Sequence, residues 1–326
     1  MPRLAFLFRT DTHVSDRSPA SWRGDYPAEI WSNLEHIGRL AKAHDVTAVL
    51  DGGDYFHVKA ATRNPHALVS RTAEIHKGYS CPVYCVEGNH DIAYNNLDSV
   101  PKQPLGVLYS AGVFQHLRET VFEDGGLRVR VVGVPYSPFR KLEELKAIQK
   151  KPGDDFLVAV VHQLAGDNPP ASVEDFFGEP VFRYSDLVTP DGPDCWNFGH
   201  WHKDQGIVKI EGKTFVNQGA LSRGSLIREN LERTPKGTLL EFTPSGLITL
   251  SCPMLVAPAE DVFDLERKDR QEKEGAEIDS FVATLRASAA YDPALSIESN
   301  LESLDFVRDI RDLAMSYLEL ARAEVG

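Results

Sequence analysis

The sequence predicts a layered α/β sandwich, and three observations carry this prediction. Over residues 1–250, short apolar stretches rich in β-branched residues alternate with helical patterns. A closing set of antiparallel strands, separated by glycine-containing turns, follows at the end of this region. Polar motifs come directly after several of the apolar stretches. Strands that alternate with helices and then continue as further strands are typical of helices packed on sheets.

Each element is expected from its own pattern. Residues 4–8 are apolar and predict a buried first strand. Residues 27–44 predict a helix, because Ile30 and Leu34 fall on one face of a 3.6-residue period. A short apolar stretch at residues 46–50 predicts the second strand.

The second helix is expected at residues 65–77, with Asn64 as its N-cap. Later apolar stretches are short and bounded by turn residues, which is typical of strands. These strands are expected at residues 83–86, 129–134, 156–161, 196–198, 207–210, 214–216, 238–242 and 247–250.

The composition changes after residue 250. Residues 266–277 are dense in charge and indicate a boundary or a linker helix. Helical patterns follow at residues 278–289 and 300–323. We therefore expect one domain at residues 1–250 and a small, mostly helical region at residues 251–326.

The bulk composition is ordinary for a globular protein, with 42% hydrophobic and 25% charged residues. No stretch approaches the roughly 20 apolar residues that span a membrane, and the N-terminal apolar stretch is too short for a signal peptide. A cytosolic protein with no membrane association is therefore predicted. The four cysteines have neither zinc-site nor disulfide spacing and are expected to be structural thiols.

The net charge of −13 seems to argue against a polyanionic substrate. Residues 251–326 contain 17 acidic and 8 basic residues, so a charge of −9 lies there and −4 remains for residues 1–250. Two bound divalent cations would bring that first region to about neutral. Nucleic acid is therefore not excluded.

Three polar motifs follow the first strands. Asp11 and His13, two residues apart, can converge on one ion. Asp54 follows two glycines that let the backbone bend, and its carboxylate can bridge two metals. Asn89 offers an amide oxygen to a metal, whereas His90 is expected to lie beside the site without binding the metal.

Two further motifs end later strands. His162 follows the strand at residues 156–161, and His200 and His202 point the same way in an extended segment. In layered α/β folds, ligands bind at the edge where such strands end. Five motifs in this order indicate one site. The remaining histidines are expected to be surface or packing residues, namely His36, His44, His66, His76 and His116.

The motifs D-x-H, G-D, G-N-H-D, H and G-H-x-H, which span residues 11–202, resemble those of the calcineurin-like metallophosphoesterase superfamily. This resemblance implies a four-layer α/β/β/α sandwich with two metal ions. It assigns the first metal to Asp11, His13, Asp54 and His202. It assigns the second metal to Asp54, Asn89, His162 and His200.

A narrower resemblance depends on His57, at a position where many superfamily phosphatases have aspartate or asparagine. The G-G-D-Y-F-H form, the His162-Gln163 pair and the G-N-H-D form are similar to the SbcD family of DNA repair nucleases. Two features depart from the family. The turn at residues 217–220 is Asn-Gln-Gly-Ala, and the region after residue 250 is short for a full capping domain.

The narrower resemblance implies a DNA exonuclease and endonuclease that acts in double-strand break repair and recombination. His90 and His57 would serve the chemistry, and Asp91 would either orient His90 or brace the turn. Nitrogen and oxygen ligands without thiolate suit Mn²⁺, which the family also favours, with Fe or Zn as alternatives.

The same resemblance implies a homodimer and a partner, an SbcC-type coiled-coil ATPase on which the C-terminal helix docks. The alternative for this helix is that its apolar face packs on its own domain. Candidate phosphate-binding cations lie in loops near the motifs, although solvated surface charges are the simpler interpretation. They are Arg17, Lys59, Arg63 and Arg223.

Two other functions remain open. A small-molecule or cyclic-nucleotide phosphodiesterase or phosphatase would use the same metals and differ in its substrate cleft. A non-catalytic scaffold would retain the fold, but the intact polar residues at every motif argue against it.

Overall fold

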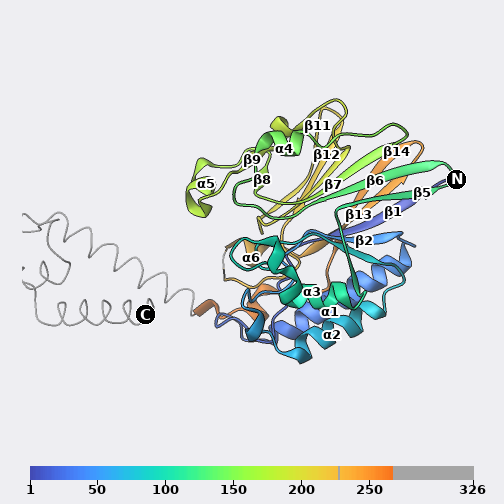
Figure 1. Cartoon of the computed structure of the whole chain (residues 1–326). Coiled ribbons are helices and arrows are strands. Elements are labelled where there is room, and N and C mark those ends of the chain that lie inside the picture. The colour runs from blue at the N-terminus through green and yellow to red at the C-terminus, as the bar shows by residue number, and fades with distance from the viewer. Residues whose placement is uncertain (227, 267–326) are drawn as a thin grey trace, which may run out of the picture. The chain divides into compact units, whose positions relative to one another are not determined.

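The computed structural model describes residues 1–226 and 228–266 of the 326-residue chain. The chain divides into two compact units, Met1–Asp264 and Leu265–Gly326, and the first unit contains both large sheets (Figure 1). The expected domain boundary at residue 250 falls inside strand β14 (Gly246–Pro253). The helices predicted at residues 278–289 and 300–323 lie outside the described residues.

The first sheet has six strands in the order β14-β13-β1-β2-β3-β4. Its four strands from β1 to β4 are parallel, and β13 and β14 add an antiparallel edge. The strands are β1 (Leu4–Arg9), β2 (Ala48–Asp51), β3 (Val83–Cys85), β4 (Phe114–His116), β13 (Lys236–Thr243) and β14 (Gly246–Pro253).

The second sheet also has six strands, in the order β11-β12-β10-β7-β6-β5. The four inner strands are parallel, whereas β11 and β5 pair antiparallel at the two edges. The strands are β5 (Glu119–Asp124), β6 (Leu127–Val134), β7 (Phe156–His162), β10 (Cys195–Gly199), β11 (Asp204–Ile210) and β12 (Lys213–Gln218). A separate pair is formed by β8 (Ala165–Gly166) and β9 (Phe182–Arg183).

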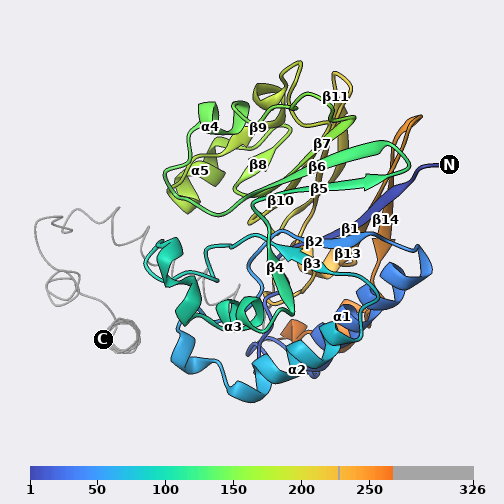
Figure 2. The same cartoon turned by 45° about the vertical axis from the view of Figure 1, so that its right-hand side comes forward.

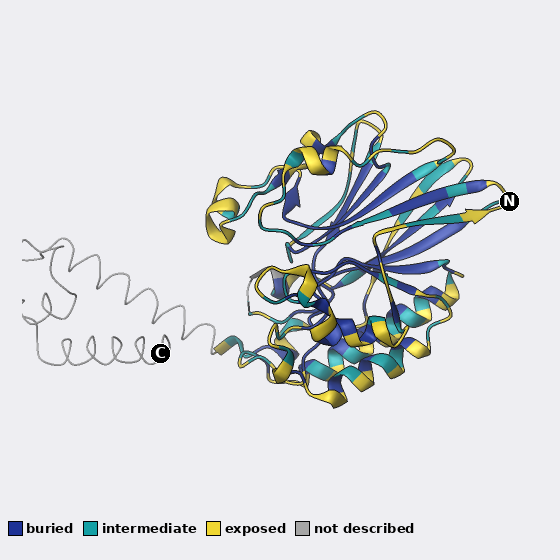
Figure 3. Ribbon diagram, in the orientation of Figure 1, coloured by how far each residue is buried: buried dark blue, intermediate teal, exposed yellow. Residues whose placement is uncertain are grey.

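The main core lies between the two sheets (Figure 3). Phe6 and Leu50 from the first sheet belong to the same buried cluster as Val131 and Val158 from the second. Parallel strands covered on both faces read as continuous apolar stretches. This is why residues 4–8 and 156–161 were predictable as strands.

Helices cover the outer faces of both sheets. On the first sheet these are α1 (Tyr26–Ala43), α2 (His66–Lys77) and α3 (Pro104–Ser110) (Figure 2). On the second sheet, Leu145 of α4 (Leu142–Lys146) and Leu187 of η3 (Tyr184–Leu187) join a second buried cluster. The predicted four-layer sandwich is therefore confirmed. The other short helices are η1 (Ala61–Arg63), η2 (Leu97–Lys102), α5 (Ala171–Phe177), α6 (Arg228–Glu232) and α7 (Ala259–Val262).

Both predicted helices of the first region are confirmed to within a residue at each end, but their caps were not both foreseen. The N-cap of α1 is Asp25, whose carboxylate accepts a hydrogen bond from the Ala28 N–H at 3.0 Å. The prediction of Asn64 as the cap of α2 is wrong, because Pro65 holds that position. The amide of Asn64 instead donates to the carbonyl oxygens of Val58 and Ala60, at 2.8 and 3.1 Å, and braces the preceding loop.

The four cysteines are free, in agreement with the prediction from their spacing. Across residues 1–226 and 228–266, no helix combines the length and the apolar character that crossing a membrane requires.

Candidate metal centre

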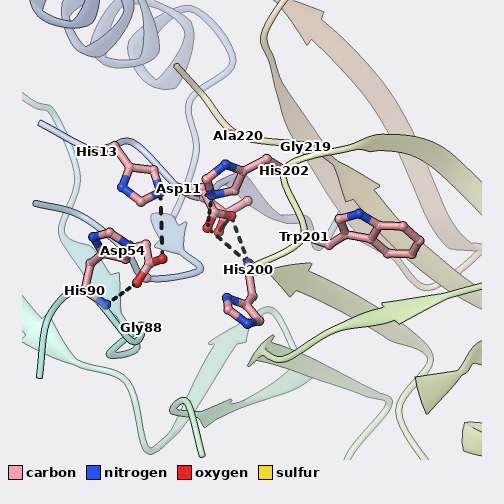
Figure 4. A network of polar contacts seen from close by, with 12 residues as sticks. Asp11, His13, Asp54, Gly88, His90, His200, Trp201, His202, Gly219 and Ala220 are labelled. Carbon is pink, nitrogen blue, oxygen red and sulfur yellow. Dashed lines mark hydrogen bonds and ion pairs between the residues drawn. The ribbon is translucent and has the colours of Figure 1, made fainter. Parts of the chain in front are cut away.

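All five predicted motifs meet at one edge of the sandwich, where strands of both sheets end. Figure 4 shows residues of four of them. Strands β1, β2 and β3 lead into the first three motifs, and β7 and β10 end in the last two. The two sheets approach closely here. A Cβ atom on Gly199, at the end of β10, would lie 2.7 Å from the carbonyl oxygen of Gly52, just after β2. Glycine at these strand ends thus lets the two halves of the site come together.

The backbone at this edge adopts conformations that side chains rarely allow. Asp11, His13, Asp54 and His200 have φ angles of 51°, 48°, 52° and 89°. Non-glycine residues in this left-handed region are uncommon and concentrate at functional sites. Backbone hydrogen bonds of 3.0 Å from Asp11 to Gly53 and from His13 to Asp54 hold two of these loops against each other.

One cluster of ligand atoms comprises Asp11, His13, Asp54 and His202, all within 4.8 Å of one another. The Nε2 atoms of His13 and His202 are 2.9 Å apart. His202 Nε2 lies 3.5 Å from Asp11 Oδ1, and His13 Nε2 lies 3.7 Å from Asp54 Oδ2. These residues are the ones that the resemblance assigns to the first metal.

A second cluster comprises Asp54, His162 and His200. His162 Nε2 lies 3.5 Å from Asp54 Oδ1 and 3.3 Å from the side-chain oxygen of Asn89. Asp54 belongs to both clusters, as a carboxylate that bridges two ions would. The structure therefore brings together all seven residues predicted to bind metal.

The chemistry of these atoms fits a bound cation. The side-chain oxygen of Asn89 lies 3.0 Å from His200 Nδ1 and 3.0 Å from Asp54 Oδ2. Without an ion, exchanging the amide oxygen and nitrogen would turn these contacts into hydrogen bonds. With a divalent cation among these atoms, the oxygen is the atom that must face inward, because cations bind lone pairs.

The titration behaviour of the cluster also favours cations. Burial would raise the pKa of Asp11, but the hydrogen bond to His202 and its charge lower the pKa to about 2. Burial likewise opposes ionisation of Asp54, but the charge and the hydrogen bond of His162 lower the pKa of Asp54 well below its usual value. Burial would lower the pKa of His162, whereas the Asp54 carboxylate raises it to about 9. Metal binding must therefore displace a proton from His162.

Further groups orient the histidines from outside the cluster. His162 Nδ1 donates to the carbonyl oxygen of Gly52 at 2.6 Å. His200 Nε2 lies 3.1 Å from Glu179 Oε1, which leaves His200 Nδ1 free to accept or to bind metal. A carboxylate on the far nitrogen of a histidine ligand fixes its tautomer and raises its basicity. Glu179 lies in the loop after α5 and is not part of any of the five motifs, so its contact with His200 was not predicted from the sequence.

The two other predicted histidines lie at the border of this cluster. The rings of His57 and His90 stack, with centroids 5.7 Å apart and an interplanar angle of 23°. His90 Nδ1 is 2.5 Å from the carbonyl oxygen of His57, and the His90 N–H donates to Asp54 Oδ1 at 2.7 Å. Together with His13, they form a group of three imidazoles whose ring nitrogens lie within 4.8 Å.

The contacts of Asp91 favour one of its two predicted roles. Its buried carboxylate accepts hydrogen bonds from the backbone N–H groups of Gly88, Tyr55 and Phe56, at 3.0 to 3.4 Å. It therefore ties the G-N-H-D turn to the loop after β2, whereas the His90 ring is held by His57.

Of the four cationic residues expected near the motifs, Arg223 differs from expectation. Its side chain is 2% exposed and forms an ion pair with Glu29 of α1 at 2.5 Å. It also donates to the carbonyl oxygen of Ala257 at 2.9 Å. Arg223 is therefore part of the packing between loops, and neither a solvated charge nor a contact for substrate.

A layered sandwich with two carboxylate–histidine clusters on its strand ends defines a metal-dependent phosphoesterase. The chain belongs to the calcineurin-like phosphoesterase family, whose profile matches residues 4–204 and so includes all five motifs. This family uses divalent metals, and the two clusters are the candidate site for them.

Similar solved structures have low sequence identity. A Thermus thermophilus sulfate thiohydrolase, SoxB, in complex with glycerol has 12% identity and a TM-score of 0.46, over 79% of this chain and 58% of that protein. The protein TT1561, also from Thermus thermophilus, has 14% identity and a TM-score of 0.42, over 76% of this chain and 98% of that protein. No curated protein matches the chain.

Proposed function

We propose that the protein is a two-metal DNA nuclease with exonuclease and endonuclease activity, acting in double-strand break repair and recombination. The observation that carries this proposal is the position of His57 beside His90 at the edge of the metal centre. The carbonyl oxygen of His57 engages His90 Nδ1, and the two rings stack. A histidine at position 57 is also the feature that resembles the SbcD nucleases.

In the proposed mechanism, the two clusters that share Asp54 would hold two divalent cations, which when bound would supply positive charge for the phosphoryl oxygens and for activation of water. His90 acts on the departing 3′-oxygen. Its Nδ1–H donates to the His57 carbonyl oxygen, which fixes the ring and directs Nε2 to the substrate side. In the imidazolium form the second proton lies on Nε2 and passes to the departing 3′-oxygen. Asp91 acts as a positioning residue, because its bonds to backbone N–H groups hold the turn that carries Asn89 and His90.

Lys59 supports a phosphate-containing substrate. Its Nζ atom lies 3.1 Å from the amide atom of Asn89 that points away from the metal cluster. When the Asn89 oxygen faces a metal, this outer atom is the amide nitrogen, so two donors point into the same space. An anionic oxygen that lies beside the pair can accept a hydrogen bond from each. We assign that place to a non-bridging oxygen of the scissile phosphate.

The second candidate is a phosphodiesterase that acts on a small molecule such as a cyclic nucleotide. A pocket of about 470 Å³ opens over Asp54, Asn89 and His90 and is lined on one side by Phe177 and Trp201. The aromatic side chains can stack on a single base, so this pocket also suits one nucleotide.

One assay separates the two candidates. Purified protein with Mn²⁺ is incubated with linear duplex DNA, single-stranded DNA circles and a small chromogenic phosphodiester. Cleavage of both DNA substrates is expected. Hydrolysis of the chromogenic ester without DNA cleavage contradicts the nuclease proposal and favours the small-molecule enzyme. Metal binding without hydrolysis of any substrate favours the non-catalytic scaffold.

The metal and the partners are part of the same proposal. We propose Mn²⁺ because nitrogen and oxygen ligands without thiolate suit it. We also propose a homodimer and an SbcC-type ATPase partner. Light scattering measures the molar mass of the full chain, alone and mixed with such an ATPase. A monomeric mass that does not increase when the ATPase is added contradicts both proposed assemblies.

A further inference from the structure

A second pocket, of about 290 Å³, lies next to the metal centre on the side of His57. Most of its walls come from the loop after the D-x-H motif and from the segment after Asp54, which runs to the end of η1. Arg17 belongs to the first loop and Arg63 to the second, and both line the pocket, with His57 as a shared wall. We call it the arginine pocket. The proposed reaction at the metal ions assigns no role to Arg17 or Arg63 in the arginine pocket.

The two arginines are available to bind an anion. Among the residues that the structure describes, no carboxylate forms an ion pair with either guanidinium group. By contrast, Arg9, Arg118 and Arg130 are each paired with a carboxylate. Asp16 also lines the arginine pocket and offsets one of its two charges. The two guanidinium groups and the one carboxylate leave the arginine pocket with a net positive charge, although the net charge of the chain is −13.

The backbone of both loops is braced by side-chain hydrogen bonds near the two exposed arginines. The hydroxyl of Ser15 accepts from the Arg17 N–H and donates to the Arg17 carbonyl oxygen, both at 3.1 Å. On the other side, the Asn64 amide holds the carbonyl oxygens of Val58 and Ala60. Arginine forms strong charge-assisted hydrogen bonds with phosphate, and a braced loop lowers the entropy lost on binding.

His57 connects the arginine pocket to the reacting phosphate, because it lines this pocket and also contacts His90. A nucleic acid strand that places one phosphate over the metal ions must carry its next phosphate away along the cleft. The pocket of about 470 Å³ over the metal centre has Phe177 and Trp201 for a base, with one lysine, Lys203, in its lining. The arginine pocket provides the positive charge that the next phosphate needs.

We infer that the arginine pocket is a binding subsite for a phosphate next to the scissile one, held by Arg17 and Arg63. This inference rests on the proposed nuclease function and specifies its substrate as a strand with at least two consecutive phosphodiesters. A dinucleotide with one phosphodiester leaves the subsite empty, so the enzyme will prefer a trinucleotide with two.

The test uses the full chain with Arg17→Gln, Arg63→Gln and both changes together. Arg39→Gln, an exposed arginine on α1, is the matched control. Fluorescence anisotropy of a single-stranded oligonucleotide in Ca²⁺ measures binding without turnover. Each pocket variant is expected to weaken binding about tenfold and to lower the salt dependence by about one unit of log–log slope. The control is expected to bind like the unmodified protein.

Hydrolysis in Mn²⁺ separates the subsite from the metal centre. The pocket variants are expected to lose the preference for the trinucleotide while hydrolysing a small chromogenic phosphodiester at the normal rate. If the unmodified protein cleaves DNA and the variants keep their affinity and preference, the subsite is wrong and the nuclease proposal stands. If the unmodified protein cleaves only the chromogenic ester, both are wrong. Equal loss on every substrate also overturns the subsite, because it places the arginines in the support of the metal centre.

Discussion

Two charged clusters, each around a buried aspartate carboxylate, lie at opposite ends of β7, and they differ in how their polar atoms are satisfied. At the carboxyl end, His162 and its neighbours form the metal centre, where carboxylate oxygens, imidazole nitrogens and an amide oxygen face one another. At the amino end, Asp154 lies among arginines. Its carboxylate accepts from Arg130 Nε at 2.7 Å, from Arg130 Nη2 at 3.0 Å and from the Lys151 N–H at 2.8 Å.

Matching of donors and acceptors therefore separates the two clusters better than charge or burial does. Asp154 and Asp54 are both buried carboxylates. Every strong contact of Asp154 is with a donor, so its cluster is complete as it stands and stabilises the fold. Near Asp54, by contrast, the side-chain oxygen of Asn89 faces Asp54 Oδ2 and His200 Nδ1 at 3.0 Å, and a cation would complete these contacts between acceptors. Buried groups that cannot satisfy one another are a physical sign of a binding site.

The largest effect is expected from Asp54→Asn. The substitution removes the carboxylate shared by both clusters, so both metals are expected to be lost from the purified protein, as measured by mass spectrometry of metal content. The loss of several kcal/mol of charge stabilisation corresponds to a fall in phosphodiester hydrolysis of at least about 10³-fold. Mn²⁺ should raise the melting temperature of the unmodified protein and leave that of the variant unchanged.

The control for this experiment is Asp98→Asn, an exposed aspartate on η2. It should keep normal metal content and activity. If the Asp54→Asn protein retains two metals at normal affinity, Asp54 is not a ligand shared by both metals. The difference drawn between the clusters around Asp54 and Asp154 would then be wrong.

The next effect is expected from His90→Ala. If His90 serves the departing oxygen and binds no metal, hydrolysis should fall about 10²- to 10⁴-fold while metal content stays normal. His66→Ala, an exposed histidine at the start of α2, should leave both unchanged. Loss of metal together with activity would instead show that His90 is a metal ligand and belongs to the metal centre.

A smaller effect is expected from Glu179→Gln. The change removes the carboxylate from His200 Nε2, which should weaken metal affinity about 10- to 100-fold. Activity should recover at high Mn²⁺ concentration, and titration of activity against Mn²⁺ measures the shift. Glu174→Gln on α5 is the matched control, because Glu174 is exposed. A fall in activity that excess Mn²⁺ does not restore would contradict a purely supporting role.

The same contrast explains what the sequence could predict. Ligand residues of the metal centre come directly after apolar strands, and parallel strands place their ends at one edge of a sheet. Asp11, Asp54, Asn89, His162 and His200 were therefore predictable from their strands alone. The sandwich itself was predictable for the related reason that strands buried on both faces are apolar throughout.

Residues outside these strand ends could not be predicted in the same way. Glu179 contacts His200 from a loop. The pattern of apolar strands does not predict the conformation of that loop. Arg223, a candidate phosphate contact for which a solvated surface charge was the simpler interpretation, is instead buried and paired with Glu29 of α1. Strand β5, at the sheet edge, has mostly exposed or half-buried residues and lacks the apolar signal of the inner strands. The satisfied cluster around Asp154 depends on pairing across three strands and has no local motif.

The smallest effect, and the sharpest test of the comparison, is expected from Asp154→Asn. Burial opposes ionisation of Asp154, but hydrogen bonds from Arg130 and from the Lys151 N–H lower its pKa. A lowered carboxylate pKa contributes stability that is complete well above the unfolded-state pKa of about 3.9. This stability is lost as the pH falls below that value and through the lower pKa of the folded state. The variant should therefore be less stable by about 1–3 kcal/mol at pH 7, measured by urea unfolding.

This difference in unfolding free energy should shrink as the pH falls below about 5, because protonated Asp154 no longer attracts Arg130. Metal content and hydrolysis at pH 7 should stay normal, and Asp186→Asn, an exposed aspartate of η3, should change neither stability nor activity. A difference that does not depend on pH would mean that Asp154 acts through packing and not through its charge. A loss of metal would mean that the two ends of β7 are coupled, and the division between a structural cluster and a functional one would fail.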